Sequence, residues 1–84
     1  MRDEALVIIL KTTDELDEKG HITMSMKMEQ KPEIQAGIPY IATKTAQTIY
    51  ITLKNDEYFY VYDYMIEKKY DEDEARELFP EVFI

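Results

Sequence analysis

The 84-residue chain contains no cysteine, no tryptophan, one histidine and only two glycines, and each scarcity excludes a kind of site. Without cysteine there is no disulfide and no zinc–thiolate centre. Two glycines, Gly20 and Gly37, cannot form the usual glycine-rich phosphate-binding loops. The only histidine, His21, and the only serine, Ser25, make no recognisable catalytic triad or metal site. We therefore expect a protein that is not an enzyme and that uses no metal or other cofactor.

Long apolar runs are also missing. The longest run, residues 5–10, is far too short to span a bilayer. The amino terminus has acidic residues before this run and no small-residue cleavage site after it, which is a poor signal peptide. A chain of this length forms one domain and buries roughly 60–65% of its unfolded surface. We expect a single soluble, cytoplasmic domain over residues 1–84.

The charge is strongly negative and unevenly distributed. The net charge is −8, and residues 56–84 carry ten acidic side chains against three basic ones, whereas residues 30–55 have a small positive excess. Such a charge repels nucleic acid and anionic membranes at long range. It favours a basic protein partner, with no direct binding of nucleic acid or membrane; the alternative is that it serves solubility alone.

Residues 47–64 predict a β-hairpin about an Asn55–Asp56 turn, because both residues tolerate the positive φ of a tight turn. The predicted register pairs Ile51 with Tyr60 and places aliphatic side chains opposite a row of tyrosines, Tyr58, Tyr60, Tyr62 and Tyr64. This row could be a stacking platform for single-stranded nucleic acid or sugars. Its acidic neighbours favour instead rings that pack over the isoleucines. The second face would carry Tyr50, Phe59 and Val61 and would need a cover, either the C-terminal helix or another protein chain.

Two further segments read as strands. The β-branched cluster over residues 5–11 predicts a strand buried on both faces, although a helix competes. Residues 21–29 alternate between apolar and polar side chains, which predicts a half-buried strand. Three methionines would lie on one side of it, Met24, Met26 and Met28; they could hold Cu(I), but alternating methionines are more often core filler.

The remaining segments predict helices and turns. Thr12 and Glu15 have the spacing of a capping box, so residues 13–19 are a helical turn or an acidic loop. Residues 31–46 are expected to be a turn-rich connection, with an extended segment from Ile41 as the alternative. Asp71 is a good N-cap for a C-terminal helix over 72–79 that would bury Ala75, Leu78 and Phe79.

These elements predict an α+β fold. We expect a small antiparallel β-sheet or partly open barrel of three or four strands (5–11, 21–29, 47–54 and 57–65) with the C-terminal helix packed on it. The apolar tail, residues 82–84, would help to close the core.

Two functional hypotheses follow, neither of them catalytic. The first is an acidic binding protein that inhibits or regulates a basic partner; its physical type suits a nucleic-acid mimic encoded by a phage or mobile element. The candidate acidic patch is Asp14, Glu15, Asp17, Glu18, Asp71, Glu72, Asp73, Glu74 and Glu77. The alternative is an assembly subunit, a homo-oligomer joined through Tyr50, Phe59, Val61, Val82, Phe83 and Ile84.

Overall fold

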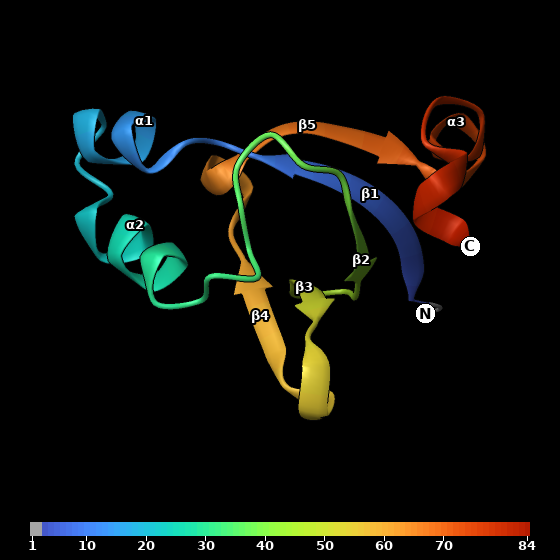
Figure 1. The fold of residues 1–84 in the computed structure, drawn as a ribbon, viewed down its shortest axis with the longest axis horizontal. Helices are drawn as coiled ribbons and strands as arrows, with labels where there is room; N and C mark the ends of the chain where they lie inside the picture. The colour runs from blue at the N-terminus through green and yellow to red at the C-terminus, as the bar shows by residue number, and fades with distance from the viewer. Residues whose placement is uncertain (1–2) are drawn as a thin grey trace.

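The structure, a computed structural model that describes residues 3–84, has an α+β fold with a five-stranded antiparallel sheet (Figure 1). The strands are β1 (Glu4–Leu10), β2 (Tyr40–Lys44), β3 (Ile49–Thr52), β4 (Tyr58–Val61) and β5 (Ile66–Asp71). The helices of the described residues are α1 (Thr13–Glu18), α2 (Ile22–Glu29) and α3 (Glu72–Leu78), with 3₁₀ turns η1 (Lys54–Asp56), η2 (Asp63–Met65) and η3 (Pro80–Phe83). The predicted α+β class is confirmed, but the sheet has five strands where three or four were expected, and β2 and β5 were not among the predicted strands.

The sheet is strongly curved and has the strand order β4-β3-β2-β1-β5. Figure 1 shows it curling until the chain passes from β4 through η2 into β5, yet the two edge strands are not hydrogen-bonded neighbours. The sheet is therefore open. The first two residues, which belong to the amino terminus judged as a poor signal peptide, lie outside the described range. Within that range no helix has the length and apolarity needed to cross a membrane.

Strand β1 is central and buried on both faces, as predicted. It pairs with β2 on one side and β5 on the other, and the adjacent side chains of Val7 and Ile8 are both fully buried. Ile8 belongs to the main core inside the curved sheet. Val7 points to the outer face, where α3 packs against β1 and β5 and buries Ala75 completely. A strand with both faces covered needs apolar residues at every position, which explains the unbroken run.

The main core fills the inside of the curved sheet and is covered at one end by α1, α2 and the following loop. Its buried members are Ile8, Leu10, Leu16, Met28, Ile34, Ala42, Ile49, Ile51, Phe59, Val61, Met65 and Ile66. They come from short elements and from the loop after α2, so the core depends on contacts between segments far apart in the sequence. The C-terminal tail contributes little to it, because Ile84 is fully exposed.

The predicted strand over residues 21–29 is wrong, because this segment forms helix α2. In the helix Met24 and Met28, four residues apart, face inward, whereas Met26 is about half exposed. The single row of three thioethers, on which the copper alternative depended, does not exist. Ser25 is buried, and its hydroxyl lies within hydrogen-bond distance of two acceptors, the carboxylate of Asp17 in α1 and the carbonyl of Ile22. The contact with Asp17 ties the two helices together, and the buried position of Ser25 fits the helical period and not the alternating one.

The prediction of a turn-rich connection over residues 31–46 is wrong for the last part of this segment. Residues 40–44 form strand β2, in line with the extended alternative from Ile41, and they pair with both β1 and β3. Only Ala42 of this strand is fully buried. A strand with one small buried side chain carries almost no hydrophobic alternation, so its pattern gave little signal.

The hairpin exists, but its predicted register is wrong by one residue. Ile51 pairs with Phe59, not with Tyr60, and the amide of Leu53 donates to the carbonyl of Glu57 over 2.7 Å. Three residues, 54–56, form the loop, and its last two have positive φ angles of 65° and 60°. The shift places Ile49, Ile51, Phe59 and Val61 together in the core. A one-residue slip exchanges the faces of one strand relative to the other. The observed register is therefore the one that buries the apolar side chains of both strands on the same face.

Helix α3 begins at the predicted N-cap. The amide of Glu74 donates to the Asp71 carboxylate over 2.8 Å, and a 3₁₀ turn starts at Pro80 after the helix has ended. The helix packs on β1 and β5, away from the hairpin, and Leu78 is about half exposed. The predicted buried stripe is therefore narrower than expected, and the helix does not cover the second hairpin face. The capped helical turn over 13–18 also forms, with the Glu15 amide bonded to the Thr12 hydroxyl over 3.1 Å.

Candidate functional site

The acidic residues singled out in the sequence form two separate groups. The α1 pole consists of Asp14, Glu15, Asp17 and Glu18, and the α3 pole consists of Asp71, Glu72, Asp73, Glu74 and Glu77. Helices α1 and α3 lie at opposite ends of the longest dimension, which is 33 Å (Figure 1). The two acidic segments therefore do not merge into one continuous patch.

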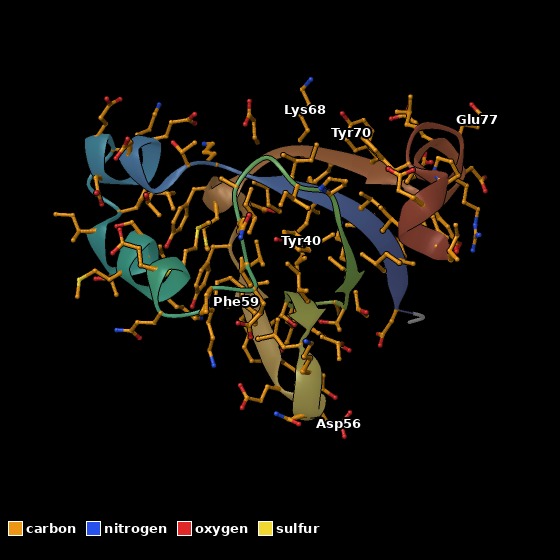
Figure 2. The ribbon with its side chains drawn as sticks, in the orientation of Figure 1. Tyr40, Asp56, Phe59, Lys68, Tyr70 and Glu77 are labelled. Carbon is orange, nitrogen blue, oxygen red and sulfur yellow. The ribbon has the colours of Figure 1, made fainter. Side chains whose placement is uncertain are left out.

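The α3 pole holds most of its carboxylates in open solvent. Asp71 caps the helix, and Glu72 pairs with Arg76 over 3.1 Å. The Arg76 guanidinium also lies 4.4 Å from the centre of the Phe83 ring, so the one cation of this helix is engaged within the protein. Its other three carboxylates are exposed and make no ion pair within residues 3–84: Asp73, Glu74 and Glu77. Figure 2 shows Glu77 directed away from the molecule. These carboxylates are available to a cation on another molecule.

The α1 pole is smaller. Asp17 accepts a hydrogen bond from Ser25, which commits one of its oxygens to the fold. The other three carboxylates are exposed and have no ion pair in the described part of the chain: Asp14, Glu15 and Glu18. The two poles thus each offer three exposed, unengaged carboxylates on a short helix.

The tyrosine row divides into two clusters, and neither packs over the isoleucines. Tyr58 and Tyr60 lie on the outer face of the sheet with Tyr50, whose ring centre is 4.8 Å and 6.1 Å from theirs. Tyr62 stacks on Tyr64, which stacks in turn on His21 with ring centres 3.9 Å apart. We call the first cluster, Tyr50, Tyr58 and Tyr60, the tyrosine face. Tyr58 and Tyr60 are about half exposed, so this face is presented to solvent.

The residues of the proposed oligomer interface do not share one surface. Phe59 and Val61 are buried in the main core and are not available to a partner, which corrects the expected second face of the hairpin. Tyr50 lies on the opposite side of the sheet. Val82 and Phe83 are half-buried in η3, which contacts β2, and Ile84 is exposed.

A cavity of about 350 Å³, which the sequence analysis did not find, opens beside the β2–β3 turn. Its lining comes from three separate segments: Lys44, Thr45, Ala46, Gln47, Thr48, Ile49, Tyr60, Val61, Tyr62, Asp63 and Lys69. Lys69 faces Asp63 across 3.5 Å, and the Thr45 and Thr48 hydroxyls are 3.0 Å apart. Hydroxyl and ammonium groups offer hydrogen bonds to a small polar molecule. Within residues 3–84 no group of three metal-ligating side chains is present.

The ion pair between Lys31 and Glu57 connects the segment after α2 to the start of β4. Its nitrogen and oxygen are 2.9 Å apart, and both side chains are partly exposed. The hydrogen bond and the charge of Glu57 raise the pKa of Lys31.

Comparison with protein-family models, with curated proteins and with solved structures finds no match to this chain.

Proposed function

We propose that this chain is a non-catalytic binding protein that engages a basic protein partner through the α3 pole. The observation that carries the proposal is the set of three exposed carboxylates at Asp73, Glu74 and Glu77, which form no ion pair with any side chain of residues 3–84. Complementary charge steers a partner to such a surface and fixes its orientation. The short helix is capped by Asp71, so the carboxylates are held on a defined backbone.

The finer proposal is that binding inhibits or regulates the partner. A row of carboxylates on a protein with a net charge of −8 can occupy a groove that normally holds phosphates. This is the behaviour of a nucleic-acid mimic and would suit a protein encoded by a phage or mobile element. The separation of the two poles means that such a mimic would use one end of the molecule at a time.

The test is affinity capture from a lysate of the source organism or its host, washed first at low and then at high salt. The α3 variant carries Asp73→Asn, Glu74→Gln and Glu77→Gln, which leave the Asp71 cap and the Glu72–Arg76 pair intact. Wild type should retain a basic protein at low salt and release it at high salt, because exposed charges are screened. The α3 variant should retain at least about tenfold less, which corresponds to about 1.4 kcal/mol of binding free energy.

Undiminished capture by the α3 variant would reject the proposal, provided that its circular dichroism spectrum matches that of wild type. A partner that stays bound at high salt would reject the electrostatic mechanism even if the partner is basic.

A further inference from the structure

Strand β4 has a free edge with unpaired backbone groups. The bond from the Leu53 amide to the Glu57 carbonyl identifies the hydrogen-bonded pairs of the hairpin, since such pairs alternate along antiparallel strands. Phe59 is therefore bonded to β3, whereas the amides and carbonyls of Tyr58 and Tyr60 point away from the sheet. Within residues 3–84 no backbone or side-chain group bonds to them. They form a template for one further strand.

The opposite edge of the sheet is protected in a way that β4 is not. Strand β5 carries three consecutive charged residues, Glu67, Lys68 and Lys69, and Figure 2 shows Lys68 directed away from the sheet. Charged side chains on an edge strand prevent pairing with other chains. Strand β4 reads Tyr-Phe-Tyr-Val and has no charge between Glu57 and Asp63. The sequence thus places charged residues on one edge strand and none on the other.

The tyrosine face lies beside this open edge. Tyr50 makes an edge-to-face contact with Tyr60 and a tilted contact with Tyr58, so the three rings support one another on the outer face. The outer face over β1 and β5 is covered by α3, and η3 contacts β2, but the rings of Tyr58 and Tyr60 on β4 are about half exposed. Rigid tyrosines bury much area at little entropic cost, and every second side chain of an added strand would pack against them.

The charges at the two ends of β4 indicate the chemistry of the added strand. Glu57 and Asp63 flank the four strand residues, and each is engaged by a lysine of the protein, at 2.9 Å and 3.5 Å. Both pairs are exposed, and exposed ion pairs contribute little stability, so an incoming cation can replace either lysine. An acidic partner strand would be repelled by both carboxylates and by the net charge of −8.

We propose that the free edge of β4 accepts an extended segment of a basic protein as an additional strand of the sheet. Main-chain hydrogen bonds to Tyr58 and Tyr60 would supply affinity. Apolar side chains would pack on the tyrosine face, and lysine or arginine at the ends of the segment would meet Glu57 and Asp63. The basic character of the partner rests on the proposed function.

The probe is a short peptide of alternating valine and threonine with a lysine at each end, titrated into isotope-labelled full chain and followed by NMR. The wild type should show shifts of the Tyr58 and Tyr60 amides, and hydrogen exchange at both should slow on binding. Tyr60→Pro removes one outward amide without breaking the β3 ladder, because edge positions tolerate proline. Its affinity should fall by about tenfold or more, the factor for one lost hydrogen bond.

Tyr60→Thr is the matched control, because it removes the same ring but keeps the amide. It should bind the peptide more tightly than Tyr60→Pro does. Equal affinity of the two variants, or peptide shifts elsewhere than β4, would overturn the proposal. Because Tyr60→Pro could fold poorly, amide exchange in the wild type decides independently: no slowing at Tyr58 and Tyr60 with bound peptide contradicts an added strand.

Three controls separate this proposal from neighbouring ones. A peptide with glutamate in place of both lysines should bind more weakly; equal binding would overturn the assignment to a basic segment. If hydrogen exchange at Tyr58 and Tyr60 becomes slower as the protein concentration rises, without peptide, the edge is assigned to a second copy of this chain. The α3 variant should bind the peptide as wild type does, so failure of the α3 proposal and failure of this one are distinguished.

Discussion

Phe59 and Tyr60 are neighbours in β4 with opposite environments. The Phe59 ring is among the largest fully buried side chains of the core, and Lys27 lies 5.1 Å from its centre, whereas Tyr60 is 46% exposed on the outer face. Neighbouring side chains of a strand point to opposite faces. The register with β3 decides that Phe59 faces the core and Tyr60 faces outward. The predicted register would have placed Tyr60 over Ile51 and Phe59 on the opposite face.

Alanine and threonine substitutions at these two positions test the register directly. Phe59→Ala should lower the free energy of unfolding by about 3–5 kcal/mol, because it leaves a cavity in the core. Tyr60→Thr should cost less than about 1 kcal/mol, since threonine keeps the strand propensity on an exposed face. Urea denaturation of both variants measures the difference. Equal losses would mean that the two faces are assigned wrongly.

The register could not be predicted because the loop length was not visible in the sequence. Asn55 and Asp56 correctly indicated a tight turn with positive φ, but a loop of two or four residues and one of three differ by one step of register. Tyrosine and isoleucine both suit strands, so local pattern did not separate the two. The decisive term is the burial of Phe59 and Val61 together with residues from other elements.

Among the elements, the helices show most clearly which signals are local. The N-caps at Thr12 and Asp71 were predicted because a cap depends on residues three positions apart. Helix α2 was missed because its N-cap, His21, makes no side-chain cap bond, and alternating methionines imitate a strand. Its Ser25–Asp17 bond joins two helices, and no local pattern reveals such a contact.

Asp71 offers a test of the cap that positions the α3 pole. Asp71→Ala should lower the free energy of unfolding by about 1 kcal/mol, because the Glu74 amide loses its acceptor. Asp71→Asn keeps an acceptor and should stay close to wild type. Thermal denaturation of the three proteins compares them. If the asparagine variant loses as much as the alanine variant, the carboxylate acts through its charge at the helix start, and the cap is not the cause.

At the scale of the whole molecule, the structure divides both surfaces that the sequence predicted as single patches. The candidate acidic patch lies at the two ends of the long axis, and the candidate oligomer interface is divided between core and surface. Composition predicted the charge of a partner, but only the three-dimensional arrangement distinguishes two poles, a tyrosine face and an open edge. The cavity beside the β2–β3 turn was equally hidden, since three distant segments form its walls.

The central claim is that the position of the carboxylates, and not the total charge, selects the partner. The matched control for the α3 variant is an α1 variant with Asp14→Asn, Glu15→Gln and Glu18→Gln, which removes the same charge from exposed residues at the other pole. The decisive measurement is the amount of basic partner that each variant retains at low salt. The account predicts near wild-type capture by the α1 variant and at least about tenfold less by the α3 variant. Equal losses in both variants would contradict it.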